Sequence, residues 1–516
     1  MTHEDLTLEW LEKQVIITAP DVELGQFLSE TREMWLKHPE ILTRIDADLD
    51  RLGLGKKRVR VATKQYYEET TAELLTGDVR CEAEERLEGG RPRMNAQVAF
   101  TCLMMRGLYG SVCSVDCLDR FYDSLCVRAF LAPYCKELPR PTTILENINA
   151  ISSSTREFIL DCQIGVVRDD GLDDFAIFLG DSTAIWANSK WPTDSFLIWG
   201  WLSRAFKISQ CLSVFGLANF PLGHGPRWLT ELKRLDFELD MEKGKVRANQ
   251  RRKTQYAQYC KKAGKLIDWL GACADEWENK VDAVCLPPVL ALRLKSLWAE
   301  LGRCLSDAYT ITLYAEERTQ SSGPIDEREP HEKLFSLSDR SARFIKKGGR
   351  ETVFGYKPQL GQSRNGLVTA LLIEEGNPAD SKQLEPLLEE HIRRVGIIPT
   401  TVTVDDGYAS GDGFKRVLAM TDNATVSING SKGRKVLGDE RWESDEYREA
   451  RRLRGLAESP ISALKRCREF GQLRRRGIDA VQAELLEKIL AYNCCRICEL
   501  RKRQQIGTAK RLVAAA

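Results

Sequence analysis

The order of periodic patterns along the chain constrains its fold more than any other feature of the sequence. One short apolar run, "DFAIFLGD", is typical of a strand and ends in Asp181. Residues 200–320 then show helical apolar spacing, and strand-like runs such as "GLVTALLIEE" and "TTVTVDD" return only after residue 333. Two organisations fit this order: two independent domains, or one α/β domain whose strands are interrupted by a helical insertion.

Length and charge bound the class of protein. A chain of 516 residues is too long for one compact core, so about two to four domains are expected. The hydrophobic share of 43% and the charged share of 29% are typical of a globular protein. Basic residues number 76 against 75 acidic ones, so any surface for nucleic acid must come from local segregation of charge.

Targeting signals and cysteines indicate the compartment. No apolar run approaches the roughly 20 residues of a membrane span, and the acidic start "MTHEDLTLEW" lacks the features of a signal peptide. We therefore expect a cytoplasmic protein with no membrane partner. In that reducing compartment, most of the 16 cysteines should be buried thiols. Cys495 and Cys498 form one CxxC, but no second pair completes a zinc site.

A helical hairpin is expected in residues 94–150. "MNAQVAFTCLMMRGLYG" predicts an apolar helix that ends at glycine, and "SVCSVDCLDRFYDSLCVRAFL" predicts a second helix with Ser111 or Ser114 as its N-cap. Helix, glycine-bearing turn and helix are compatible with a helix-turn-helix that reads DNA. An ordinary helical hairpin, which is far commoner, fits the same pattern.

Three carboxylates stand at positions that suit metal chemistry. Asp181 and Asp405 each end a predicted strand, and Glu458 lies on a predicted helix in "RRLRGLAESPISALKR". Arg454 and Lys465 fall near the same helix face as Glu458, at spacings of four and seven residues. Pro460 either bends this helix locally or marks its start.

Carboxylates held on rigid strand ends suit phosphoryl transfer. Magnesium prefers oxygen ligands, and two such ions roughly 3.5–4 Å apart can clamp an in-line displacement at phosphorus. Each residue also has a purely structural interpretation. Asp181 fits a helix N-cap, Asp405 or Asp406 a turn before Gly407, and Glu458 a solvated helix position.

Three ordered motifs resemble those of bacterial insertion-sequence DDE transposases. "GDSTAIWANSKWPTDS" resembles their first-aspartate segment, "VDDGYASGDG" their Asp-x-Gly-Tyr motif, and "RGLAESPISALKR" their motif with arginine, glutamate and lysine. "EKLFSLSDRSARFIKKGGRETVFGYKPQL" resembles the strand pair before the second aspartate in the ISNCY-like branch, and "GGRPRMNAQVAFTCLMMRGLYG" its N-terminal helical domain. The resemblance covers roughly residues 85–200 and 330–495.

The resemblance implies an α/β fold with a ribonuclease-H-like mixed five-stranded sheet, interrupted by a helical insertion and preceded by an all-helical DNA-binding domain. Asp181 would lie on the first strand, Asp405 just after the fourth, and Glu458 on a late helix. The expected domains are a helical and charged region at 1–90, a helix-turn-helix-like DNA-binding domain at 91–165, the catalytic core at 166–200 and 330–480, the insertion at 201–329, and a C-terminal helix and tail at 481–516.

The resemblance also implies an activity. Asp181, Asp405 and Glu458 would be the catalytic residues and would bind two Mg²⁺ ions, with Mn²⁺ as a substitute. The enzyme would cut double-stranded DNA at terminal inverted repeats and join the 3′-hydroxyl to target DNA. It would act as a homodimer, in the cytoplasm and associated with the nucleoid.

Basic residues of the third motif would contact DNA. The resemblance implies this role for Arg454 and Lys465, and we extend it to Arg451. Two departures from the family pattern stand out. Asp406 occupies a variable position that is often basic, and Arg451 stands where a tyrosine is frequent, the nearest one here being Tyr447.

Two rival functions keep the fold but change the activity. One is a transposase-derived protein that binds DNA without cleaving it. The other is a ribonuclease-H-like nuclease that hydrolyses DNA and does not join it. The N-terminal domain and the insertion favour full transposition, because pairing two ends needs more DNA-binding surface than hydrolysis does.

Overall fold

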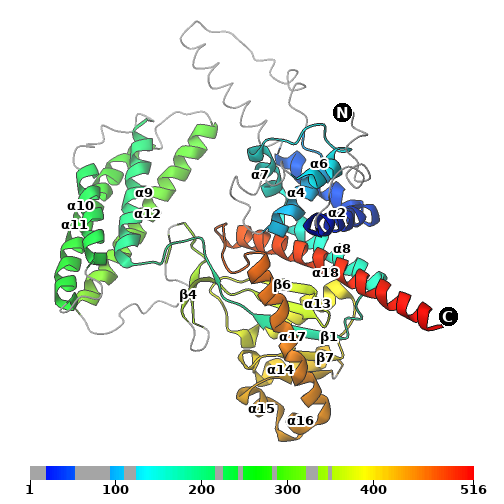
Figure 1. Ribbon diagram of the computed structural model, residues 1–516. Coiled ribbons are helices and arrows are strands. Elements are labelled where there is room, and N and C mark those ends of the chain that lie inside the picture. The colour runs from blue at the N-terminus through cyan, green and yellow to red at the C-terminus, as the bar shows by residue number, and fades with distance from the viewer. Residues whose placement is uncertain are drawn as a thin grey trace. The chain divides into compact units, whose positions relative to one another are not determined.

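The computed structural model divides the chain into two compact units (Figure 1). The described residues are 19–52, 93–109, 124–214, 225–241, 248–281, 288–320, 335–336, 338–346, 351–422 and 424–515. The first unit takes its described residues from Met1–Lys56, Glu84–Asn188 and Ser341–Ala516, and the second takes them from Ser189–Arg340. Strands from both sides of the helical block thus lie in one unit and pair in one sheet.

A five-stranded mixed sheet forms the centre of the first unit, in the order β6-β5-β1-β7-β8. β1 runs parallel to β7 and antiparallel to β5, β7 runs parallel to β8, and β5 runs antiparallel to β6. The strands are β1 (Ile177–Ser182), β5 (Gln359–Ser363), β6 (Val368–Leu372), β7 (Thr401–Val404) and β8 (Thr425–Ile428). The predicted mixed sheet of five strands is confirmed, and it is compatible with a ribonuclease-H-like DDE domain.

Alternation along the parallel strands decides what each face of the sheet contacts. Phe178, Val402, Val404 and Val426 share one buried apolar core with α13 (Leu384–Val395) and α14 (Gly411–Met420). Side chains at the intervening positions point to the other face. There α17 (Asp445–Cys467) contacts β1 and β7. Figure 1 shows α17 running across these strands.

A small second sheet was not predicted. It has the order β2-β4-β3 and consists of β2 (Ile185–Trp186), β3 (Arg343–Ile345) and β4 (Val353–Tyr356). The segment "ETVFGYKPQLGQS" contains both β4 and β5, which lie in different sheets. Pro358 lies between them and has no N–H to continue a ladder of hydrogen bonds.

The described residues of the second unit form four helices around one apolar core. They are α9 (Asp194–Val214), α10 (Gly225–Met241), α11 (Ala248–Val281) and α12 (Pro288–Gln320). Tyr256 and Trp269 of α11 pack against this core. The compact unit, Ser189–Arg340, extends beyond the insertion predicted at 201–329 at both ends.

The N-terminal helices pack on the long C-terminal helix. α18 (Ile478–Ala515) contacts three of them. Those are α2 (Ala19–Lys37), α4 (Ala96–Tyr109) and α8 (Ser153–Asp169), and two shorter helices are α6 (Leu125–Leu131) and α7 (Pro141–Ala150). The described helices of the domain predicted at 91–165 belong to the same compact unit as the sheet, and the bounds of that domain stay a prediction. Its DNA-binding role stays a prediction.

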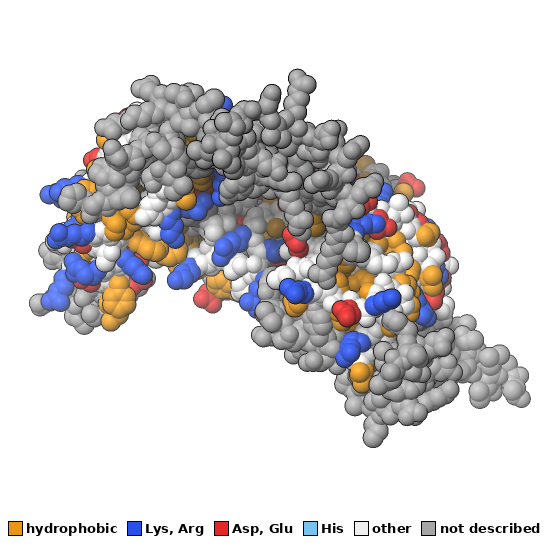
Figure 2. Space-filling model, turned by 90° about the horizontal axis from the view of Figure 1, so that it is seen from above, with side chains coloured by type: hydrophobic (Ala, Val, Ile, Leu, Met, Phe, Trp, Pro, Cys, Tyr) orange, Lys and Arg blue, Asp and Glu red, His pale blue; other side chains and the backbone are white. Residues whose placement is uncertain are grey.

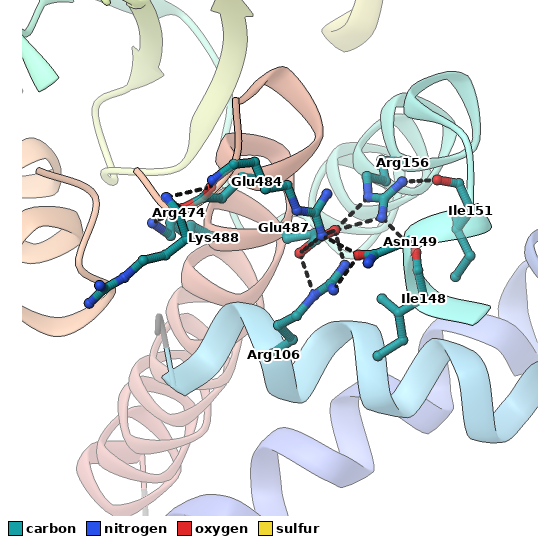
Figure 3. Close-up of polar contacts among 10 residues, drawn as sticks. Arg106, Ile148, Asn149, Ile151, Arg156, Arg474, Glu484, Glu487 and Lys488 are labelled. Atoms are coloured by element: carbon teal, nitrogen blue, oxygen red, sulfur yellow. Dashed lines mark hydrogen bonds and ion pairs between the residues drawn. The ribbon is translucent and has the colours of Figure 1, made fainter. Parts of the chain in front are cut away.

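A buried carboxylate explains why these helices stay with the sheet (Figure 3). Glu487 of α18 accepts hydrogen bonds from Arg106 of α4 at 2.6 and 2.8 Å, and from Arg156 of α8 at 2.6 and 2.9 Å. Arg475 pairs with the same carboxylate at 3.1 Å. Burial raises the pKa of Glu487, but the charges of the three arginines outweigh burial and lower that pKa to about 2.

Only some of the other predictions for the N-terminal part fall on described residues. Ser111 and Ser114, the predicted N-caps, lie outside the described residues, and so does most of the second predicted helix. Ser124 caps α6 instead, through its hydroxyl and the amide of Val127. The twelve described cysteines are free thiols and most are buried, as predicted. No described helix is both long and apolar enough to cross a membrane.

Loss of the buried carboxylate should destabilise the whole first unit. We expect Glu487→Gln to lower the free energy of unfolding by about 3–5 kcal/mol, because three guanidinium groups lose their shared anion. Urea unfolding at neutral pH measures this. The control, Glu499→Gln, removes an exposed ion pair with Arg496 and should cost less than about 1 kcal/mol. Equal losses from the two variants would contradict the role of Glu487.

The same carboxylate should make stability depend on pH in acid. Its pKa is lower in the folded protein than the usual 4.5, so its contribution is present above about pH 4.5 and disappears as the pH falls towards 2. The wild-type advantage over Glu487→Gln should therefore shrink by about 3 kcal/mol across that interval. Urea unfolding of both proteins over this pH range provides the measurement. A constant difference would show that the carboxylate is not held ionised by its arginines.

Candidate active site

Two predicted carboxylates lie at the same end of neighbouring parallel strands. β1 and β7 pair with Leu179 opposite Thr403, so continuing this register by two residues places Asp181 level with Asp405. Adjacent strands are about 4.8 Å apart, and the carboxyl ends of parallel strands meet at one edge of a sheet. The fold thus brings together two residues that are far apart in the sequence.

Both aspartates occupy positions that alternate away from the apolar core. A Cβ placed on Gly180 would lie 2.9 Å from Val404 Cγ1, so these preceding residues share the core face. Asp181 and Asp405 therefore fall on the face that α17 covers. Gln362 of β5 confirms the position of this helix, because its side chain donates to the backbone oxygen of Ala457 at 3.3 Å.

The carboxylate of Asp181 is buried and paired with a cation. Its Oδ2 lies 2.8 Å from Nη2 of Arg454, and its Oδ1 accepts from the amide of Ser182 at 2.8 Å. Arg454 comes from α17, so the contact joins the helix to the end of β1. The sequence placed Arg454 beside Glu458 but gave no sign that its partner would be Asp181.

The structure distinguishes the roles of the adjacent aspartates. Asp406 Oδ1 accepts from the amides of Lys432 at 2.8 Å and Gly433 at 2.9 Å, in the first turn of α15 (Ser431–Leu437). Asp405 Oδ1 accepts from the amide of Gly407 at 3.0 Å, two residues further along the chain. Asp406 thus stabilises a helix N-terminus, which favours Asp405 as the ligand.

Glu458 lies on the same helix as Arg454 but is exposed. Within the described ranges, Asp181, Asp405 and Glu458 do not form a group whose ligand atoms lie within 4.8 Å of one another. The one such group found there is His38, Glu40 and Cys162. Glu458 stands about one helical turn beyond Arg454, whose guanidinium pairs with Asp181 of β1.

A fourth carboxylate was missed by the sequence interpretation. Asp380 lies in the 3₁₀-helix η2 (Asp380–Lys382), which precedes α13. A Cβ on Gly407 would lie 3.1 Å from Asp380 Oδ2 and 3.0 Å from Asp405 Oδ1, so both carboxylates approach this glycine. Asp380 also pairs with Lys357 at 3.3 Å. Helix-start signals cannot reveal such contacts between distant residues.

Tyr408 and Gln359 link these acidic residues. The Tyr408 hydroxyl donates to Gln359 Oε1, and Gln359 Nε2 donates to Asp380 Oδ1 at 2.7 Å. Gln359 is also the register partner of Ser182 on β1, directly after Asp181. Burial raises the pKa of Tyr408 well above its usual value, and the negative charges of Asp380, Asp181 and Asp405 add to this effect. The tyrosine therefore stays a neutral hydrogen-bond donor.

The other predicted DNA contacts have different surroundings. Lys465 donates to the backbone oxygen of Ala184 at 3.4 Å, close to the end of β1. Arg451 donates to the backbone oxygen of Trp442 at 2.6 Å, and its guanidinium carbon lies 4.0 Å from the centre of that ring. Tyr447 is buried in the apolar core. Lys465 thus lies near the candidate site, whereas Arg451 is held by Trp442.

The donor set at the strand ends fits a hard divalent cation. Asp181, Asp405, Asp380 and Glu458 offer carboxylate oxygens, which Mg²⁺ and Mn²⁺ prefer. The edge of a sheet and a covering helix provide rigid supports for these ligands. Three carboxylates act together on the buried Tyr408, so negative charge is concentrated at this edge.

Part of the chain is similar to a known protein family. Residues 325–494 match a protein family described as "Transposase DDE domain". The match supports a DDE transposase family. It includes Asp405 and Glu458, while Asp181 lies outside the matched segment. No curated protein and no solved structure matches the chain. A DDE transposase family supports a transposase function in general, and it implies DNA binding and the use of divalent metal ions.

The different roles of the two adjacent aspartates can be tested by amide exchange. Asp406→Ala removes the acceptor for the Lys432 and Gly433 amides, a loss worth about 1 kcal/mol for a helix cap. Exchange in the first turn of α15 should therefore accelerate by about fivefold. Asp405→Ala, the matched control, should leave that turn protected. Faster exchange in α15 with Asp405→Ala alone would reverse the assignment.

Proposed function

We propose that this chain is a DDE transposase of the ISNCY-like branch. It cuts double-stranded DNA at the terminal inverted repeats of its element and joins the exposed 3′-hydroxyl to target DNA. The observation that carries the proposal is the meeting of Asp181 and Asp405 at the ends of adjacent parallel strands, on the face covered by α17. The family match over residues 325–494 supports it independently.

The chain's own residues would perform defined tasks in this reaction. Asp181, Asp405 and Glu458 would hold two Mg²⁺ ions, or Mn²⁺ in their place. Such ions would supply activation of the attacking oxygen and stabilisation of the leaving oxygen in an in-line displacement. Arg454 and Lys465 on α17 contact DNA phosphates beside the reacting group. The guanidinium of Arg454 binds a phosphate as a forked donor, and the ammonium of Lys465 binds it as a point charge. Arg451 contacts DNA further along the same helix.

Basic side chains on the helical unit support a DNA partner. Among its described residues, Arg251, Lys253, Lys261 and Lys265 of α11 are exposed. Figure 2 shows Lys and Arg side chains standing out on one face of the molecule. Such groups bind the phosphate backbone without reading sequence. We propose that this unit holds DNA flanking the cut, with two copies of the chain pairing two transposon ends, in the cytoplasm and on the nucleoid.

Cleavage of the element's own ends tests the proposal. With Mg²⁺, wild type should cut a duplex carrying the flanking inverted repeat. Asp181→Asn, Asp405→Asn and Glu458→Gln should each reduce the rate by about 100-fold or more, because each removes a charged ligand from the metal site. The matched control is Asp406→Asn, which keeps a good helix cap and should retain activity within about tenfold. Gel analysis of end-labelled DNA gives the rates.

A second assay separates the rival functions. Pre-cut ends with a free 3′-hydroxyl are mixed with a supercoiled plasmid, and joined products are measured. Cutting without joining would identify a nuclease of this fold. Binding of the ends without cutting, in Mg²⁺ and in Mn²⁺, would identify a DNA-binding protein that has lost catalysis. If Asp406→Asn is as active as wild type and Asp405→Asn loses activity, Asp405 is assigned as the second aspartate ligand of the metal site.

A further inference from the structure

The cation that contacts Asp181 in this structure belongs to the protein itself. Arg454 Nη2 lies 2.8 Å from Asp181 Oδ2, and the two side chains are only 13% and 10% exposed. Asp181 is also a proposed metal ligand. The same carboxylate oxygen thus has two competing positive partners, one from α17 and one from solution.

We propose that Arg454 is a positioning residue that couples metal binding to DNA binding. Without DNA, its guanidinium holds Asp181 and weakens metal binding there. With DNA, a backbone phosphate draws the guanidinium away and releases the carboxylate to the metal. This inference rests on the proposed function, since it takes Asp181 as a metal ligand.

Charge and geometry make the two partners exclusive. Asp181 Oδ1 accepts from the Ser182 amide, and Oδ2 is held by Arg454, so both oxygens already have donors. A magnesium ion binds oxygen at about 2.0–2.1 Å and demands near-octahedral geometry. A guanidinium on the same oxygen would then lie within a few ångströms of a divalent cation, where like charges repel strongly in a buried setting.

Unused donors of Arg454 point to a phosphate as its alternative partner. Its Nε and Nη1 are buried and have no hydrogen-bond partner among the described residues. A guanidinium carries five N–H donors, and leaving buried donors unpaired is unfavourable. Phosphate oxygens match this fork in a bidentate manner. A DNA phosphate therefore offers Arg454 more than the single contact it makes with Asp181.

A purely structural ion pair predicts the opposite behaviour. If Arg454 only fastened α17 to β1, its removal would loosen the site and weaken metal binding. Under competition, its removal strengthens metal binding in the absence of DNA. The two roles are therefore distinguished by the direction in which metal affinity changes, without any measurement of catalysis.

Mn²⁺ binding to the full chain provides the test, with free Mn²⁺ measured by electron paramagnetic resonance. The DNA probe is a pre-cut duplex that ends at the inverted repeat. For wild type, the duplex should raise Mn²⁺ affinity by about tenfold, within the usual range of coupling between sites. Arg454→Gln should bind Mn²⁺ about tenfold more tightly than wild type without DNA, and the duplex should then add less than about twofold.

Three further variants make the result decisive. Arg452→Gln removes the same charge from an exposed position of α17 and should leave Mn²⁺ affinity unchanged. Arg454→Lys keeps a cation and should bind Mn²⁺ as weakly as wild type without DNA. This variant also keeps the test valid if the glutamine variant fails to fold. Unchanged or weaker Mn²⁺ binding by a folded Arg454→Gln would overturn the coupling. Asp181→Asn should lose Mn²⁺ binding, and if it does not, the metal site of the proposed function fails instead.

Discussion

The buried carboxylate of Glu487 is the interaction on which the arrangement of the first unit depends. Three arginines from α4, α8 and the segment before α18 converge on it. Figure 3 shows Glu487 between Arg106 and Arg156. A carboxylate with so many cationic partners is stabilising only while all of them are in place, since each buried charge needs its counterpart. The N-terminal helices therefore fold as part of the sheet unit.

Buried ion pairs also connect α8 to the helix that packs beside the candidate site. Arg394 of α13 is fully buried and pairs with Glu157 and Asp161 of α8, the latter at 2.6 Å. α8 is thus bound on one side to α18 and on another to the helix that packs against β1. Strand β1 follows α8 after a short connection and carries Asp181. Helices far from the site in sequence thus determine where this carboxylate lies.

Local sequence patterns were sufficient to predict where strands end. Short strand-like runs ending in Asp181 and Asp405 indicated two strand ends, and the resemblance indicated a mixed sheet of five strands. Contacts between distant residues were beyond that reasoning. No pattern shows that Asp406 accepts from the first turn of α15, that Arg454 reaches Asp181, or that Asp380 approaches Gly407. These contacts depend on how helices lie against the sheet, which periodicity does not contain.

Internal cations allow the acidic edge of the sheet to exist at all. Three carboxylates act on the buried Tyr408, and such a concentration of like charge opposes folding unless it is compensated. Arg454 compensates Asp181, and Lys357 compensates Asp380. A chain with a net charge of only +1 has little general excess of positive charge, so compensation must be local. Asp181 and Asp380 therefore already have cationic partners before any ion arrives. Binding a metal there therefore means exchanging one cation for another, and the free energy of that exchange depends on what receives the displaced guanidinium.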